Sequence, residues 1–129
     1  MAEKEKTAKV LVVEDEEILL TGLKEELESG GYTVQGASDG VEGLEQTKSF
    51  KPDLILLDLL MPKMDGMEML QKLKADSATR DVPVVILTNL SDYEKISEAL
   101  SLGAMDYLVK ANYKLEDLLE KVRTVLARS

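Results

Sequence analysis

The segment DLILLDLLMPKMDG (residues 53–66) places an aspartate inside a strongly apolar run. Residues 53–57 predict a strand that is apolar on both faces after Asp53, as is typical of a central strand in a parallel sheet. Asp58 follows this strand directly, and three more apolar residues come after it. Because a buried carboxylate without a partner is costly, Asp58 needs a specific reason to lie there.

The rest of the chain alternates in the same way between short β-rich runs and longer amphipathic segments whose apolar residues recur at helical spacing. The expected strands are 9–13, 32–37, 53–57, 83–87 and 106–110, and the expected helices are 17–31, 41–50, 66–76, 93–102 and 115–128. In the last helix, the apolar stripe is expected to consist of Leu115, Leu118, Leu119, Val122 and Leu126. Five such units predict an α/β fold, a doubly wound five-stranded parallel sheet with helices on both faces.

Composition narrows the classes of function. The chain has 129 residues, which suits one domain, and it contains no cysteine and no histidine. Disulfides, thiolate metal sites and histidine-based catalysis are therefore excluded. The formal net charge of −9 disfavours direct binding to nucleic acids and to anionic membranes. With no apolar run of about 20 residues and no signal-like start, we expect a cytoplasmic protein with a loose tail at 1–8 and one domain at 9–128.

Polar residues follow four of the five expected strands. The carboxyl ends of parallel strands meet at one edge of the sheet, where such folds bind ligands. Each of these residues has an ordinary structural explanation when taken alone, for example a carboxylate favouring a helix N-terminus. Together they would all have to converge on that edge by coincidence. They are Glu14 and Asp15 after the first strand, Asp58 after the third, Thr88 and Asn89 after the fourth, and Lys110 at the end of the fifth.

This set of side chains suits phosphoryl chemistry. Three neighbouring carboxylates repel one another, and a hard cation such as Mg²⁺ relieves that repulsion. A carboxylate can attack phosphorus to give an aspartyl phosphate, whose oxygens then need a metal, a cation and a hydroxyl donor. Asp58, Mg²⁺, Lys110 and Thr88 would supply these groups.

The motifs VLVVEDE (10–16), LILLDLLMPKMDG (54–66), VVILTN (84–89) and DYLVK (106–110) make the chain similar to receiver domains of two-component response regulators. The resemblance spans about residues 8–127 and implies the flavodoxin-like strand order 2-1-3-4-5. It also implies a signalling protein and not an enzyme in the usual sense. A histidine kinase or phosphotransfer protein would donate the phosphoryl group, and the phosphorylated form, a monomer or weak dimer, would act on a downstream target protein.

The resemblance assigns roles at the metal site. Asp58 would be the phosphoacceptor and a Mg²⁺ ligand. Asp15 would bind the ion directly, Glu14 would hold a metal-bound water, and the backbone carbonyl of Leu60 would be the third protein ligand.

The resemblance also implies a switch. Thr88 would hydrogen-bond the attached phosphoryl group, Lys110 would pair with one of its oxygens, and Tyr107 would turn inward as Thr88 moves. The surface that responds would be formed by the fourth helix, the fifth strand and the fifth helix, roughly residues 92–128. In this picture phosphorylation biases an existing two-state equilibrium.

Several positions depart from the family pattern. Ala111 stands where members usually have a cis proline, and the cost of about 3 kcal/mol for a non-proline cis bond favours a trans bond. Leu60 and Leu90 replace residues that are often polar and that control the access of water to phosphorus, so we expect slow self-dephosphorylation. Asn89 is larger than the usual residue beside the threonine and could crowd the site.

Three other functions fit the sequence less well. The main alternative is a receiver-like interaction module whose partner binding does not require phosphate. A phosphatase of the haloacid dehalogenase type would need an aspartate two residues after the nucleophile, where this chain has Leu60. A flavodoxin-like FMN carrier would need a hydroxyl-rich loop after the first strand, where this chain has EDEE (14–17).

Overall fold

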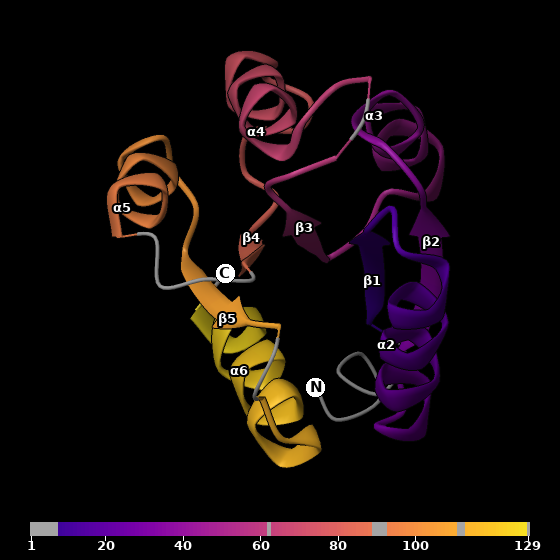
Figure 1. The fold of residues 1–129 in the computed structure, drawn as a ribbon. Coiled ribbons are helices and arrows are strands. Elements are labelled where there is room, and N and C mark those ends of the chain that lie inside the picture. Colours follow the sequence, from indigo (N-terminus) through magenta and orange to yellow (C-terminus); the bar gives the residue numbers. More distant parts are fainter. Residues whose placement is uncertain (1–7, 62, 89–92, 111–112, 129) are drawn as a thin grey trace.

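The computed structural model describes residues 8–61, 63–88, 93–110 and 113–128. Within these ranges five strands alternate with five helices, as the sequence predicts (Figure 1). The strands are β1 (Lys9–Val13), β2 (Thr33–Ala37), β3 (Leu54–Asp58), β4 (Val84–Thr88) and β5 (Asp106–Val109). The helices are α2 (Glu17–Ser29), α3 (Gly40–Phe50), α4 (Gly66–Ala75), α5 (Tyr93–Ser101) and α6 (Leu115–Arg128).

The strands form one parallel sheet in the order β2-β1-β3-β4-β5, which confirms the fold class. The register aligns their carboxyl ends at one edge. Asp58 lies opposite Leu87, and Thr88 lies opposite Val109. The strand-end residues singled out in the sequence are therefore brought to the same side of the molecule.

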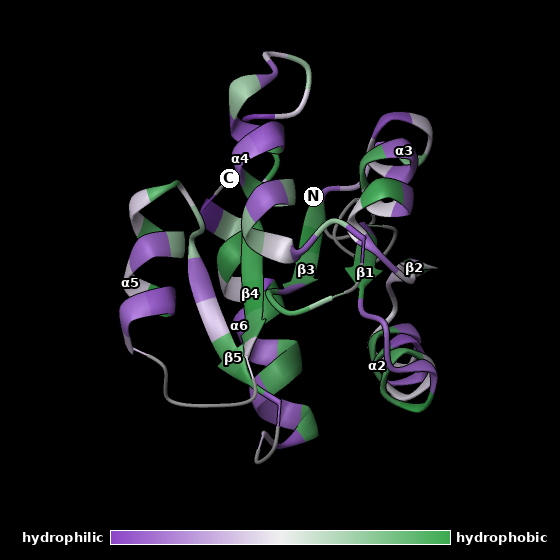
Figure 2. Cartoon of the chain, turned by 45° about the horizontal axis from the view of Figure 1, so that its top comes forward, coloured by the Kyte–Doolittle hydropathy of each residue, from purple (hydrophilic) through white to green (hydrophobic). Residues whose placement is uncertain are grey.

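Helices cover both faces of the sheet. On one face, α2 and α6 pack with Leu23, Leu27 and Val122 against the strands. On the other, α4 contributes Met69 and Leu70, with α3 and α5 beside it. All residues of β3 and β4 are buried, and Figure 2 shows these strands as hydrophobic over most of their length while the helices have hydrophilic outer sides. This pattern is expected for a parallel sheet covered on both faces.

Two helices next to the site begin at side-chain caps. The carboxylates of Asp39 and Asp65 accept hydrogen bonds from the backbone N–H groups of Glu42 and Glu68, each at 2.9 Å. These bonds satisfy donors that the first turn of a helix leaves open. Asp65 therefore fixes the start of α4 at Gly66, eight residues after Asp58.

Some expected boundaries and contacts are wrong in detail. β3 runs from Leu54 to Asp58, so Asp53 precedes the strand and Asp58 ends it. The Asp53 carboxylate accepts the Lys9 backbone N–H at 2.8 Å. In α6, Val125 is buried and Leu115 is 42% exposed, so Val125 belongs to the apolar stripe and Leu115 does not. Leu118, Val122 and Val125 recur at spacings of four and three, which places them on one helix face.

No helix in the described ranges is both long and apolar enough to cross a membrane. The bond between residues 110 and 111, for which the sequence favours the trans form, lies outside the described residues.

Candidate functional site

The end of β1 supplies two carboxylates with different exposure. The backbone N–H of Glu14 donates to the Ala37 carbonyl at 2.9 Å, so the strand pairing continues one residue beyond β1. The Glu14 side chain is fully buried, and its Oε2 accepts the backbone N–H of Glu16 at 3.0 Å. Asp15 is exposed. One carboxylate thus points into the protein while its neighbour faces solvent.

Asp58 joins these two residues from the end of β3. Its side chain is almost completely buried, and its Oδ1 accepts the backbone N–H of Leu60 at 3.2 Å. One carboxylate oxygen from each of Glu14, Asp15 and Asp58 lies within 4.8 Å of the other two. The structure therefore brings together the three acidic residues that the sequence predicts to share a site.

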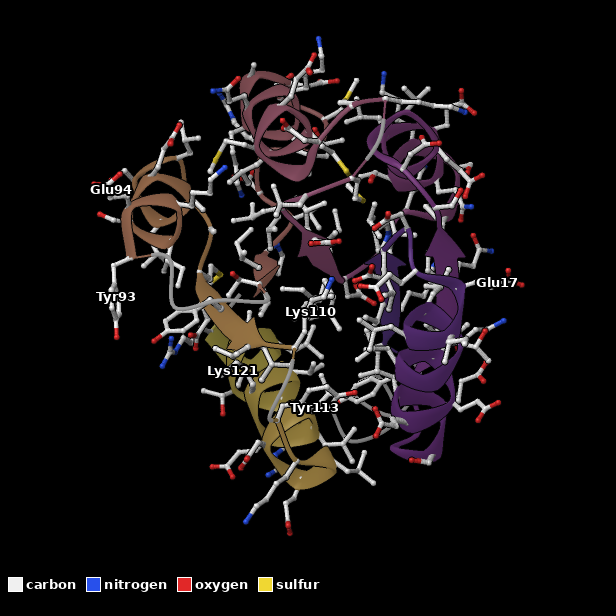
Figure 3. All side chains as sticks on the ribbon, in the orientation of Figure 1. Glu17, Tyr93, Glu94, Lys110, Tyr113 and Lys121 are labelled. Carbon is white, nitrogen blue, oxygen red and sulfur yellow. The ribbon has the colours of Figure 1, made fainter. Side chains whose placement is uncertain are left out.

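Lys110 provides the counter-charge. Its backbone N–H donates to the Thr88 carbonyl at 2.7 Å, which holds it at the end of β5. Its Nζ lies 2.9 Å from Glu14 Oε1 and 3.2 Å from Asp58 Oδ2. Figure 3 labels Lys110 in the interior of the molecule, between β5 and α2. A third carboxylate, that of Glu16, lies 3.5 Å from Nζ, and sequence reasoning did not identify this residue.

Burial and charge shift the pKa values of these groups. Burial raises the pKa of Glu14 to about 7, although Lys110 and the Glu16 N–H act in the opposite direction. Burial also raises the pKa of Asp58, against the Leu60 N–H and Lys110. Burial alone would lower the pKa of Lys110, but the carboxylates of Glu14 and Asp58 outweigh it and raise that pKa. One ammonium group therefore does not fully compensate the buried acidic groups.

The donor set fits a hard divalent cation. Oε1 of Glu14 is buried and has no well-directed hydrogen bond to a described residue, although the ammonium of Lys110 is close. Ionised carboxylates only accept hydrogen bonds, so the three acidic residues cannot satisfy one another. Oxygen ligands of this kind are those that Mg²⁺ takes in proteins. Glu14, Asp15 and Asp58 can therefore hold such an ion together.

Thr88 and Tyr107 lie on neighbouring strands. Thr88 ends β4 and is buried, and Tyr107 in β5 lies opposite Ile86. Because Thr88 is two residues beyond Ile86, its side chain leaves the sheet on the same face as Tyr107. The Tyr107 ring is half-buried against the core under α4 and α5, with Lys121 Nζ 5.4 Å from its centroid. The two proposed switch residues thus share one side of the sheet.

Of the three residues expected to influence self-dephosphorylation, the structure describes only Leu60. The Leu60 side chain is 60% exposed, so it does not pack into the core. Asn89 and Leu90 lie outside the described residues.

A doubly wound sheet with an acidic cluster and a paired lysine at its carboxyl edge is the arrangement that the motif resemblance predicts. The chain belongs to the response regulator receiver domain family, because the model of that family matches residues 10–123. This confirms the resemblance seen in the motifs.

The chain is also similar to two longer regulators. The chain is 37% identical over 121 residues to the DNA-binding dual master transcriptional regulator RpaA of Synechocystis and 38% identical over 123 residues to the response regulator MprA of Mycobacterium ulcerans. These alignments cover 94% and 95% of this chain but 50% and 52% of the relatives, so the chain spans about half the length of the curated relatives it matches.

Solved structures agree with the fold. The chemotaxis protein CheY4 of Vibrio cholerae is 33% identical with a TM-score of 0.86, over 92% of this chain and 98% of that one. The receiver domain of a signal transduction histidine kinase from Syntrophus aciditrophicus is 34% identical with a TM-score of 0.85, over 95% and 92% of the two chains.

The raised pKa of Glu14 predicts how stability depends on pH. A carboxyl group whose pKa rises from 4.5 to about 7 on folding binds its proton more tightly in the folded state. The metal-free protein should therefore lose stability as pH rises from about 5 to 7 and level off above, by on the order of 1–3 kcal/mol. Urea unfolding at several pH values measures this slope. Glu14→Gln should flatten it, and an equal slope in both proteins would contradict the assignment to Glu14.

Proposed function

We propose that residues 9–128 form one receiver unit that accepts a phosphoryl group on Asp58 from a phosphohistidine donor. The observation that carries the proposal is the geometry of Asp58, a buried carboxylate 3.2 Å from the Lys110 ammonium and within 4.8 Å of Glu14 and Asp15. A purely structural ion pair would need one carboxylate beside Lys110, whereas Glu14 and Asp58 are both buried beside its ammonium. One of the two buried charges would then remain uncompensated.

The residues of the chain have distinct parts in the transfer. An oxygen of ionised Asp58 attacks phosphorus, an O–P bond forms and the N–P bond of the donor breaks, leaving the donor histidine with the electron pair. The Leu60 N–H on Oδ1 and Lys110 on Oδ2 orient the carboxylate. Asp15, Asp58 and the Leu60 carbonyl would hold Mg²⁺, with Glu14 on a bound water, and the ion would neutralise charge on the phosphoryl oxygens.

The attached phosphoryl group would then reach the other strand ends. Lys110 keeps its place by exchanging its contact with the Asp58 carboxylate for one with a phosphoryl oxygen. Thr88 would donate its hydroxyl to another oxygen, and movement at Thr88 frees space on the face that it shares with Tyr107. We propose that α5, β5 and α6 form the surface that reports this change to a downstream protein.

The charge of that surface favours a basic partner. An open groove of about 610 Å³ lies between β5 and α6, and its lining includes Asp106, Asp117, Glu120 and Lys121. Lys121 already contacts Asp106 at 3.3 Å and the Tyr107 carbonyl at 2.7 Å. A second copy of the chain docked through the same groove would place carboxylates against carboxylates, whereas a basic surface would complement them.

Labelling with a small phosphodonor tests the proposal. With acetyl phosphate and Mg²⁺, the wild-type chain should gain one phosphoryl group by intact mass, and Asp58→Asn should gain none. Asp53→Asn is the matched control, since Asp53 is near in sequence but bonds the Lys9 backbone instead. Label retained in Asp58→Asn, or lost equally in Asp53→Asn, would refute Asp58 as the acceptor.

Magnesium binding should depend on Asp15. Removing its charge in Asp15→Asn should weaken Mg²⁺ binding by at least about tenfold, a loss typical of damaged metal sites. Glu17→Gln is the control, because Glu17 is close in sequence but lies outside the three-carboxylate cluster. The rise of melting temperature with Mg²⁺ concentration gives the affinity of each variant. Equal affinities in wild type and Asp15→Asn would remove Asp15 from the ligand set.

A further inference from the structure

A hydrogen bond connects the segment that follows Lys110 to helix α2. The hydroxyl of Tyr113 donates to Oε1 of Glu26 at 2.6 Å, between residues 87 positions apart in sequence. Burial and the neighbouring Glu26 raise the pKa of Tyr113, so the phenol remains a donor at all working pH values. Short hydrogen bonds to a carboxylate are among the strong ones in proteins.

The Tyr113–Glu26 hydrogen bond lies between two segments that each carry residues of the site. Tyr113 follows Lys110 by three residues and packs against the core under α2 and α6. Figure 3 shows it between those two helices. Glu26 is in α2, the helix that begins directly after Glu14, Asp15 and Glu16. The bond therefore joins the segment after the lysine to the helix after the acidic residues.

Apart from the ion pairs of its ammonium, the restraint on Lys110 among the described residues comes from the strand side. Its backbone N–H is fixed to the Thr88 carbonyl, on the strand side. The sequence between Lys110 and Tyr113 is Ala-Asn, with no proline ring to restrict the backbone. In the described residues after Lys110, the next side chain that is tied to α2 is Tyr113. The hydrogen bond thus supplies the second restraint.

We propose that Tyr113 and Glu26 are positioning residues that hold Lys110 at the distance from Glu14 and Asp58 that phosphoryl binding requires. This inference rests on the proposed function, because Lys110 is then the cation that receives a phosphoryl oxygen. Loss of the bond lets the segment after β5 move relative to α2, and the Lys110 ammonium loses its fixed place. The acidic cluster itself does not depend on the bond, since β1 and β3 hold it.

The test measures two affinities of each variant. One is the affinity for beryllofluoride, a mimic of the phosphoryl group, and the other is the affinity for Mg²⁺ alone. Tyr113→Phe keeps the ring and removes the hydroxyl, and it should weaken beryllofluoride binding roughly fivefold, in the range of coupling between neighbouring residues. Glu26→Ala should match it. Glu26→Gln retains an acceptor oxygen and should remain close to wild type. Tyr93→Phe is the matched control, because Tyr93 is 75% exposed on α5.

The affinity for Mg²⁺ alone distinguishes a displaced Lys110 from general damage to the site. Because Lys110 repels a cation, its loss of position leaves Mg²⁺ binding by Tyr113→Phe unchanged or slightly stronger. Weakening of Mg²⁺ and beryllofluoride binding by equal factors would overturn positioning in favour of a structural role. If Tyr113→Phe bound beryllofluoride as tightly as the wild type, the positioning role of Tyr113 would be refuted. The proposed function would not be affected by that result. Failure of the wild-type chain to bind beryllofluoride would refute both.

Discussion

Gly66→Ala should lower the free energy of unfolding by about 3 kcal/mol or more. A Cβ atom on Gly66 would lie 2.0 Å from the Asp58 carbonyl oxygen and 2.7 Å from the Leu59 Cα, and backbone atoms cannot rotate away. The Gly66 N–H also donates to the Leu59 carbonyl at 2.9 Å, which fixes this close approach. The segment after Asp58 must therefore move, and the Leu60 carbonyl moves with it.

Gly22→Ala is the control for this substitution. A Cβ atom on Gly22 would meet nothing within 4 Å, and the residue lies inside α2. Replacing an unhindered helical glycine with alanine should raise stability by about 0.5–1 kcal/mol. Urea unfolding of both variants measures the contrast, and Mg²⁺ affinity should fall only in Gly66→Ala. If both substitutions changed the free energy of unfolding in the same direction, close packing would not be the reason that position 66 requires glycine.

The parts of the site that lie at strand ends could be predicted from the sequence. A β-rich run is a local signal, and the residue that follows it can be read directly, as with Asp58 after Leu54–Leu57. Parallel topology then places all such ends at one edge, so Glu14, Asp58 and Lys110 meet although 96 positions separate the first from the last. No side-chain detail was needed for this step.

Contacts that depend on how helices lie on the sheet could not be predicted in this way. Glu16 reaches Lys110 only because α2 begins at the edge of the site, and Tyr113 meets Glu26 only because α2 and α6 pack side by side on one face. Hydrophobic periodicity gives the face of a helix but not its axial position. Leu115 was expected in the α6 stripe because it continues the helical spacing of Leu118 and Val122, but it is the first residue of the helix and is 42% exposed.

Lys110→Met should destabilise the metal-free protein by about 3 kcal/mol at pH 8, because it leaves two buried carboxylates without a cation. The Lys110 side chain is 4% exposed, and Glu14 and Asp58 lie 2.9 and 3.2 Å from its Nζ. Methionine fills similar space, so packing changes little. The loss should shrink at pH 5.5, because burial raises the pKa of Glu14, removal of Lys110 raises it further, and the protonated carboxyl group needs no cation.

Lys121→Met is the matched control for loss of a lysine. The Lys121–Asp106 pair has side chains 29% and 31% exposed, so removing it should cost at most about 1 kcal/mol at either pH. Saturating Mg²⁺ should narrow the gap between Lys110→Met and wild type, since a divalent ion at Glu14, Asp15 and Asp58 replaces the missing positive charge. Denaturant unfolding at both pH values, with and without Mg²⁺, separates these effects. A loss in Lys110→Met that is the same at pH 5.5 and pH 8 and is insensitive to Mg²⁺ would mean that Lys110 stabilises the fold by packing, not by compensating the acidic site.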